Sequence, residues 1–223
     1  RLPGTVFCFA PETDFPPLPA GERTGPIVFG SINNAPKLNT RTLKCYAGVL
    51  SAVPQSRLSL RAPSFVDAAA VDHFRAGLRA AGADLDRVEF HPPLPLPDMM
   101  AAFADIDIVL DSVPYCGGTT THQALWMGVP VVSMMGEGFA ARMGASFLSA
   151  AGLSDLIARD DAEYRAVAET LAKDRTRLAE LRRNLRSRLI GHDAWNAVRH
   201  TRALEGAMFA MAQGGAHRDA NDQ

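Results

Sequence analysis

"DIVLDSVPYCGGTTTHQALWMGVPVV", residues 107–132, is the segment that decides the fold. An apolar run at residues 106–110 opens it and a second run at 130–134 closes it, and both are typical of buried strands. Two glycines, three threonines and a helix-like stretch at residues 120–127 lie between them. This order of strand, loop, helix and strand predicts a βαβ unit with two parallel strands.

The same alternation extends upstream of this segment. Asn39 is expected to cap the first helix, and Gly82 to close the second. Strands are expected at 27–29, 57–60 and 87–90, and helices at 39–53, 67–81 and 97–105. Apolar strands that alternate with helices indicate an α/β fold, a doubly wound parallel sheet covered on both faces.

Downstream of residue 138 the pattern predicts helices only. They are expected at 138–150, 161–173, 175–190 and 193–212. The third of these carries six arginines, for which a phosphate-binding role is conceivable. A solvated face is favoured, because leucines at four helically spaced positions form an opposite, buried stripe.

Length and composition indicate one domain. The chain has 223 residues and 47% hydrophobic residues, enough for one sizeable core. Five prolines within residues 11–26 predict an extended linker at 1–25, followed by the domain at 26–213. The polar tail at 214–223 is expected to be disordered.

Charge and cysteine content argue against several classes of partner. A formal net charge of -1 gives no electrostatic reason to expect nucleic acid or an anionic membrane. The sequence has no apolar run of about 18 residues. Its three cysteines are odd in number and lack a C-x-x-C pattern, so we expect no disulfide framework, no metal site and a cytoplasmic location.

The glycine- and threonine-rich loop is the first candidate binding site. Ligands of open parallel sheets bind beyond the carboxyl ends of the strands, where this loop lies. Gly117 and Gly118 allow close backbone approach, and the amides of Thr119, Thr120 and Thr121 would open a helix toward an anion such as a diphosphate. The alternative is that Thr119 or Thr120 only caps the helix and the glycines only form the turn.

A second candidate follows the first strand. The stretch "FGSINNAPK", residues 29–37, places polar side chains and Lys37 at the same edge of the sheet. Lys37 could reach the same anion and stabilise charge on a leaving diphosphate. The alternative is an ordinary surface lysine.

Cys116 and two aspartates are candidates for other kinds of catalytic site. Cys116 could be a nucleophile with His122 as its base, although a small structural thiol is favoured. Asp107 and Asp111 bracket a strand and could form a carboxylate pair, but the simpler interpretation is that they are the two ends of a buried strand.

An ordered set of motifs resembles a known family. The motifs are "FGSINNAPKLN", "VPQSRLSLRAPS", "DIVLDSVPYCGGTTTHQALWMGVPVV", "GEGFAARMGASFL" and "AGLSDLIARDDAEY". Together they look like the C-terminal half of the catalytic region of O-GlcNAc transferases, including the bacterial homologues and the SPINDLY proteins. The resemblance spans about residues 1–210 and implies the Rossmann-like, donor-binding domain of a GT-B glycosyltransferase, in a family that usually carries tetratricopeptide (TPR) repeats upstream.

Several positions match the donor-binding residues of that family. Lys37 matches the lysine that contacts the donor diphosphate, and Asn34 matches a polar position facing the donor. Thr119 and Thr120 match the threonines whose amides and hydroxyls hold the phosphates.

Three other positions depart from the family pattern. Gln123 stands where an acidic residue commonly bonds the ribose. Met99 stands where a histidine near the nucleotide is common, and Leu96 where the vertebrate enzymes have a lysine beside the base. These departures leave the identity of the donor open.

The resemblance implies an inverting, metal-independent transfer of N-acetylglucosamine from UDP-GlcNAc to protein serine or threonine. The acceptor protein would be engaged through an N-terminal catalytic domain outside this chain, so the fragment alone is expected to bind donor without turnover. Arg142 could approach the sugar or the acceptor, or only pack the following helix. The alternatives are a degenerate nucleotide-sugar sensing module and a GDP-fucose-dependent O-fucosyltransferase domain.

Overall fold

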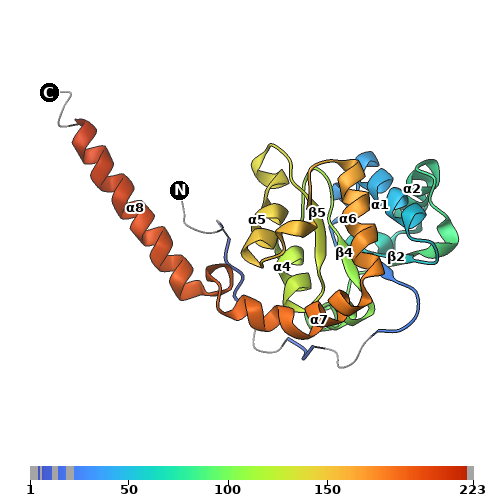
Figure 1. The fold of residues 1–223 in the computed structure, drawn as a ribbon. Coiled ribbons are helices and arrows are strands. Elements are labelled where there is room, and N and C mark those ends of the chain that lie inside the picture. The colour runs from blue at the N-terminus through green and yellow to red at the C-terminus, as the bar shows by residue number, and fades with distance from the viewer. Residues whose placement is uncertain (1–4, 6, 12–14, 19–22, 220–223) are drawn as a thin grey trace.

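The chain folds around a six-stranded parallel sheet (Figure 1). The computed structural model describes residues 5, 7–11, 15–18 and 23–219. The strand order is β3-β2-β1-β4-β5-β6, the arrangement of doubly wound nucleotide-binding folds. The strands are β1 (Val28–Ser31), β2 (Arg57–Arg61), β3 (Val88–His91), β4 (Ile108–Leu110), β5 (Val131–Met134) and β6 (Ile157–Ala158).

Within the part of the chain that the structure describes, eight α-helices connect and follow these strands. Asn39 caps α1 by accepting a hydrogen bond from Thr42 N at 3.0 Å, as expected from the sequence. Gly82 follows α2 with a φ of +87°, a conformation that favours glycine. The helices are α1 (Thr40–Ala52), α2 (Ala68–Ala80), α3 (Leu96–Ala102), α4 (Thr119–Trp126), α5 (Met143–Ala150), α6 (Asp161–Lys173), α7 (Arg175–Ile190) and α8 (Ala197–Asp219).

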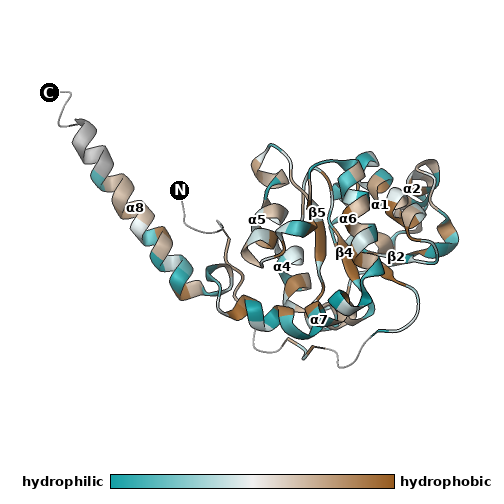
Figure 2. Ribbon diagram, in the orientation of Figure 1, coloured by the Kyte–Doolittle hydropathy of each residue, from teal (hydrophilic) through white to brown (hydrophobic). Residues whose placement is uncertain are grey.

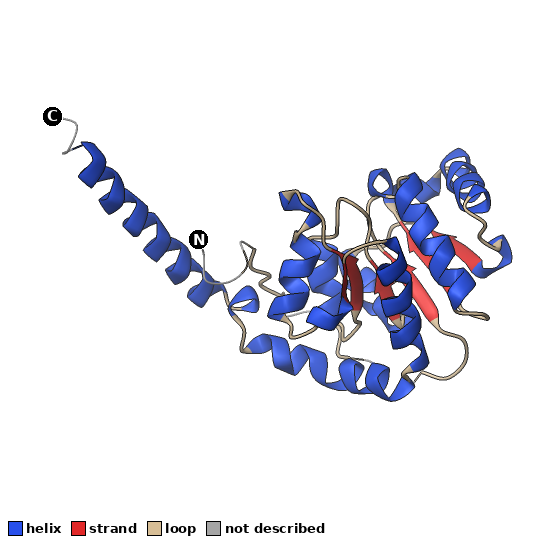
Figure 3. Ribbon diagram, turned by 45° about the horizontal axis from the view of Figure 1, so that its top comes forward, coloured by secondary structure: helices blue, strands red, loops and turns tan. Residues whose placement is uncertain are grey.

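The helices form layers on the two faces of the sheet. Helix α1 packs with α2 and α6, whereas α4 packs with α5 and α7 (Figures 1 and 3). The apolar strands lie between these layers, and much of α7 is hydrophilic (Figure 2). This arrangement confirms the expected α/β fold.

Two details of the sheet differ from the expectation. Residues after 138 are not helical only, because β6 pairs with β5 through Ser133–Ile157 and Met134–Ala158. A strand of two residues is too short to show a period. Strand β2 also alternates in burial, with buried Leu58 and Leu60, so its other face is not fully covered.

The N-terminal segment is extended, and part of it packs against the domain. Phe9 and Phe15 pack against the hydrophobic core, and Phe9 N donates a hydrogen bond to Ala194 O at 2.8 Å. Residues 1–4, 6, 12–14 and 19–22 of the expected linker lie outside the described residues.

The arginine-rich helix α7 is not simply a solvated face. Arg182 is buried and donates hydrogen bonds to Ile106 O and, at 3.4 Å, to Ala104 O. Arg186 Nε donates to Trp126 O at 2.7 Å. Ile106 and Ala104 precede β4. The hydrogen bonds of Arg182 therefore connect α7 to the amino ends of the strands, at the edge of the sheet opposite the expected phosphate site.

Helix α8 extends away from the rest of the domain (Figures 1 and 3). Its backbone is helical through Asp219, and the expected disorder of residues 214–223 stays a prediction. Residues 220–223 lie outside the described part of the chain. Among the helices described, none combines the length and apolarity needed to cross a membrane.

Candidate functional site

Two loops meet at the carboxyl ends of β1 and β4. These strands are parallel neighbours, with Phe29 paired to Ile108. Lys37 ends a short 3₁₀ helix, Ala35–Lys37, and its Nζ donates a hydrogen bond to Cys116 O at 2.9 Å. The ammonium group also lies 4.0 Å from the centre of the Tyr115 ring, a cation–π distance. The loops predicted to converge therefore do so.

The convergence borders a cavity of about 390 Å³. Five of the candidate residues line it together: Asn34, Lys37, Gly118, Thr119 and Thr120. The remaining lining residues, which sequence reasoning did not assign to the site, are Phe7, Cys8, Phe9, Asn33, Tyr115, His122, Met143 and Phe147. Three of these come from the N-terminal segment expected to be a linker, and no local sequence signal marks them as part of a site.

The first turn of α4 faces this cavity without a side-chain cap. Gly118 is the N-cap residue and has no side chain to accept a hydrogen bond. The amides of Thr121 and His122 both donate to Gly118 O, at 3.1 and 3.3 Å. Neither Thr119 nor Thr120 is the cap, so the capping alternative is wrong. The amides of Thr119 and Thr120 precede the first of these bonds, at the positive end of the helix dipole.

The two glycines of the loop have different roles. A Cβ added to Gly117 would lie 3.0 Å from Thr120 Oγ1 and 3.2 Å from Asp111 Oδ1, so packing within the protein requires glycine there. A Cβ added to Gly118 would meet no atom within 4 Å. Gly118 lines the cavity, so the room beside it is available to a ligand.

Lys37 is partly removed from water. Burial lowers its pKa from the usual value, while the nearby Asp111 and Cys116 act in the opposite direction. Asp111 itself is buried, and that burial raises the pKa of its carboxyl group. The sequence pattern does not identify Asp111 as a residue that supports the glycine- and threonine-rich loop.

The other candidate residues do not line the cavity. Thr121 and Gln123 lie on the buried side of α4, at 2% and 6% exposure. Leu96 and Met99 of α3 are half-buried and pack against the hydrophobic core. Arg142 is exposed and borders a neighbouring hollow with Phe139.

Cys116 has the surroundings of a structural thiol. Its Sγ donates to Ala140 O at 2.8 Å and accepts from Gly144 N at 3.0 Å. Burial raises the pKa of Cys116 to about 11, and burial lowers the pKa of His122 to about 4. A neutral thiol and a weakly basic imidazole do not form an activated nucleophile.

His122 lies in an aromatic cluster behind the first turn of α4. Its ring centre lies 3.9 Å from that of Phe147, 5.1 Å from Trp195 and 5.6 Å from Phe9, which stacks on it. Nδ1 faces Gly118 O at 3.2 Å, so Nδ1 carries the proton and donates it. Among the described residues, Nε2 has no hydrogen-bond partner.

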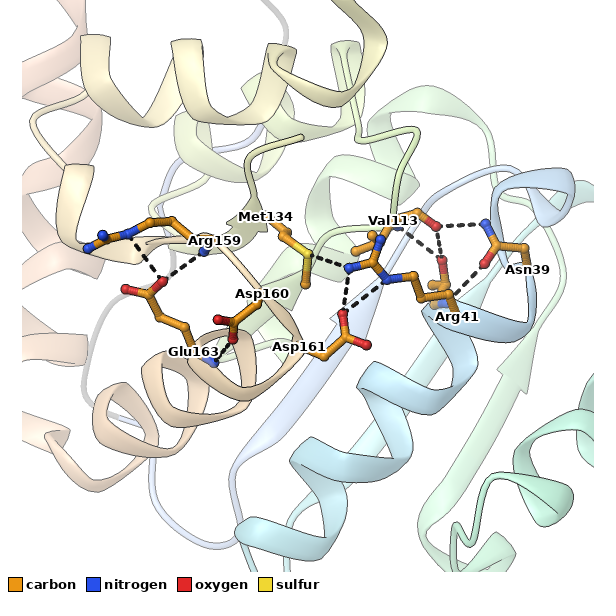
Figure 4. A network of polar contacts seen from close by, with 9 residues as sticks. Asn39, Arg41, Val113, Met134, Arg159, Asp160, Asp161 and Glu163 are labelled. Carbon is orange, nitrogen blue, oxygen red and sulfur yellow. Dashed lines mark hydrogen bonds and ion pairs between the residues drawn. The ribbon is translucent and has the colours of Figure 1, made fainter. Parts of the chain in front are cut away.

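Helix α1 and its cap Asn39 contact Val113, in the loop that precedes Gly117 and Gly118 (Figure 4). Asn39 Nδ2 donates to Val113 O at 2.6 Å, and Thr42 Oγ1 bonds both Val113 O and Val113 N. Arg41 pairs with Asp161 of α6, with Nη2 to Oδ1 at 2.8 Å. These contacts connect the loop, α1 and α6 into one polar network.

Among the described residues, no group of three or more histidine, cysteine, aspartate or glutamate side chains is arranged to hold a metal ion.

The family model "Glycosyl transferase family 41" matches residues 21–204. The chain is 37% identical over 214 residues to a tomato (Solanum lycopersicum) protein named "Probable UDP-N-acetylglucosamine--peptide N-acetylglucosaminyltransferase SPINDLY". That match covers 95% of this chain and 23% of the relative, so the chain spans about a quarter of such relatives. A Caenorhabditis elegans protein named "UDP-N-acetylglucosamine--peptide N-acetylglucosaminyltransferase" is 33% identical over 158 residues, covering 70% of this chain and 13% of its own length.

Solved structures agree with this relationship. A mutant of Thermobaculum terrenum O-GlcNAc transferase is 35% identical, with a TM-score of 0.83 over 91% of this chain and 38% of its own. Sucrose-phosphate synthase from Thermosynechococcus elongatus shares the fold alone, with 16% identity and a TM-score of 0.60 over 86% of this chain and 46% of its own. The chain belongs to glycosyl transferase family 41, the family of O-GlcNAc transferases and SPINDLY proteins, and forms its GT-B-like Rossmann domain.

Proposed function

We propose that this chain is the donor-binding part of an inverting glycosyltransferase that transfers N-acetylglucosamine from UDP-GlcNAc to protein serine or threonine. Membership of family 41 and the names of the relatives support this reaction. The nucleotide sugar is a substrate, and the proposal requires no metal.

One observation carries the proposal. The Lys37 ammonium group donates a hydrogen bond to Cys116 O at 2.9 Å. Lys37 lines the same cavity as Asn34 and the first turn of α4. A cation, an amide side chain and free helix amides suit a diphosphate, which presents several oxygen acceptors and negative charge.

The proposed reaction assigns a distinct role to these groups. The acceptor hydroxyl attacks the anomeric carbon while the bond to the diphosphate oxygen breaks, and negative charge develops on the leaving UDP. Lys37 and the amides of Thr119 and Thr120 would stabilise that charge. The protein acceptor would be engaged through an N-terminal catalytic domain and TPR repeats outside this chain, and that catalytic domain would supply the group that receives the acceptor proton.

The departures from the family pattern define a second candidate. Gln123 is a buried amide where the family commonly has an acid, and Leu96 and Met99 do not line the cavity. These observations favour either another donor, such as GDP-fucose, or a binding module without catalysis. A cytoplasmic setting is proposed for all of these cases, supported by three free cysteines, Cys8, Cys45 and Cys116.

Calorimetry with a nucleotide panel tests donor binding. UDP, UDP-GlcNAc, GDP and GDP-fucose are titrated into the chain, and we expect UDP and UDP-GlcNAc to bind and to raise the melting temperature. Preference for the guanine nucleotides would move the assignment to a fucose donor. No heat and no thermal shift with any member would refute donor binding.

Transfer is tested on the full-length protein. We expect it to label protein serine or threonine with N-acetylglucosamine, whereas the chain alone binds without turnover. Donor binding with no hydrolysis and no labelling, across a broad acceptor panel, would favour the sensing module.

A further inference from the structure

A buried carboxylate lies directly behind the glycine- and threonine-rich loop. Asp111 follows β4 and is 1% exposed. Its Oδ1 accepts hydrogen bonds from Gly117 N at 2.6 Å and Ser112 N at 2.9 Å, and its Oδ2 accepts from Ser133 Oγ at 2.7 Å. The carboxylate therefore closes the loop on itself and ties it to β5.

The contacts of Asp111 continue to the second loop of the site. Asn33 Nδ2 lies 3.5 Å from Asp111 Oδ1, and Thr120 Oγ1 donates to Asn33 Oδ1 at 3.4 Å. Asn33 is 4% exposed and belongs to the loop that carries Lys37. A chain of polar contacts thus runs from the buried carboxylate through Asn33 to the first turn of α4.

The surrounding structure leaves room for this carboxylate and fixes its backbone. A Cβ added to Gly144 would lie 2.7 Å from Asp111 Oδ2, and one added to Gly117 would lie 3.2 Å from Oδ1. The buried Tyr164 Oη donates to Asp111 O at 2.8 Å. Burying a carboxylate is costly unless its oxygens are hydrogen-bonded, and three donors within 3 Å meet that need here.

We propose that Asp111 is a positioning residue for the donor diphosphate, which acts through Gly117, Asn33 and Lys37 without touching the donor. The proposal rests on the proposed function of the cavity. Asp111 is not among the residues that line the cavity, so its effect reaches a ligand only through these neighbours. It holds the Gly117 amide in place, orients the Asn33 side chain and supplies the negative charge that faces Lys37.

The charges around Lys37 identify Asp111 as its counter-charge. From the β4–α4 segment, Asp111 and Cys116 lie near enough to the ammonium group to raise the pKa of Lys37, and the Tyr115 ring lies under that group. From other elements, Cys8 and His122 line the same cavity. Cys116, with a pKa of about 11, and His122, with a pKa of about 4, are both neutral near pH 7. Loss of the Asp111 charge should therefore lower the pKa of Lys37.

Asp111→Asn is the variant that separates charge from shape. The two backbone amides can only donate, so Oδ1 must remain an acceptor, as the oxygen of an amide would. The new amide nitrogen would take the place of Oδ2 and donate to the Ser133 hydroxyl. Shape and hydrogen bonds are retained, while the charge is lost.

Asp107→Asn is the matched control. Asp107 lies at the opposite end of β4, its side chain is 5% exposed, and it pairs with Arg23 at 2.9 Å and Val28 N at 2.8 Å. It therefore has similar burial and suffers the same change of charge, but at the other edge of the sheet. A loss specific to Asp111→Asn cannot be attributed to general destabilisation.

The test measures UDP affinity by calorimetry, the Gly117 amide proton shift and the Lys37 titration by NMR in both variants and the parent chain. For Asp111→Asn we expect about tenfold weaker UDP binding, an upfield Gly117 amide proton and a lower Lys37 pKa. For Asp107→Asn we expect a lower melting temperature with UDP affinity within about twofold of the parent. Unchanged UDP affinity in a folded Asp111→Asn variant, or an equal loss in both variants, would overturn the proposal.

Two further measurements keep the outcome decisive. Should Asp111→Asn fail to fold, Ser133→Ala removes one donor to the carboxylate, and an affinity for UDP equal to that of the parent would overturn the proposal. Should the parent chain bind no nucleotide, the proposed function fails, while the NMR readouts still judge Asp111. An unmoved Gly117 amide and an unmoved Lys37 titration would then refute its positioning role.

Discussion

Lys37 Nζ donates a hydrogen bond to the backbone oxygen of Cys116 at 2.9 Å and so joins two loops that lie 79 residues apart in the sequence. The ring of the adjacent Tyr115 lies 4.0 Å below the same ammonium group. The cation is therefore held in place at the carboxyl edge before any ligand arrives. Such preorganisation reduces the entropy that binding must otherwise cost.

Replacement of Lys37 should weaken donor binding. Lys37→Ala removes a charged donor, a change of roughly 1.5–3 kcal/mol, so we expect UDP affinity to fall by about 10- to 150-fold. Lys44→Ala, an exposed lysine of α1, is the control and should leave affinity unchanged. In the full-length protein the transfer rate should fall more than donor affinity, because the charge acts chiefly as the bond breaks. Equal affinities for Lys37→Ala and the parent, measured by calorimetry, would remove Lys37 from the site.

The first turn of α4 supplies a second prediction. Gly118→Val places side-chain atoms where a Cβ now meets nothing within 4 Å, so the fold should persist while UDP binding is blocked. Thr119→Ala removes one exposed hydroxyl and should weaken binding by roughly tenfold. Because Gly118 is the N-cap residue, Thr119→Ala should leave the melting temperature nearly unchanged. Unaltered affinity in both variants would mean that this stretch only turns the chain.

His122 predicts a dependence of stability on pH. Burial lowers its pKa from 6.5 to about 4, so between these values the unfolded state binds more protons than the folded state. The stability that His122 contributes is fully present above pH 6.5 and is lost as pH falls toward 4, by about 3 kcal/mol in all. In His122→Phe, the free energy of unfolding should fall less steeply across this window, as chemical denaturation at a series of pH values would measure. Parallel pH curves for the two proteins would exclude His122 as the titrating group.

The buried arginine of α7 should matter for stability and not for ligand binding. Arg182→Met removes the donor to Ile106 O, whereas Ala104 O keeps the hydrogen bond from Arg23 Nη1 at 2.9 Å, and we expect a loss of about 1–3 kcal/mol in the free energy of unfolding. Arg188→Met is the control, since Arg188 is 45% exposed and forms an ion pair with Glu180, for which we expect a change within about 0.5 kcal/mol. UDP affinity should be unchanged in both. Weaker UDP binding in Arg182→Met at unchanged stability would revive a phosphate-binding role for α7.

The local pattern of the sequence predicts most of the fold. Asn39 caps α1, Gly82 takes a positive φ after α2, and helices α6 and α7 have the expected bounds. Periodicity and capping depend on residues within a few positions of one another, so a single sequence contains them. Strand β6 escaped prediction because two residues carry no period, and its pairing with β5 defines it.

The sequence by itself determined that Lys37 and the Gly117–Thr121 loop end at one edge of a parallel sheet, because parallel strands share the direction of their carboxyl ends. Only the tertiary structure decided that Phe9 completes the cavity wall and that Asp111 supports the loop from behind. Only the tertiary structure showed that Arg182 is buried rather than solvated. The reason is that these contacts join distant segments, as in the pair of Arg182 and Ile106, which are 76 residues apart. The topology of the chain creates such contacts, and local periodicity and propensity do not encode them.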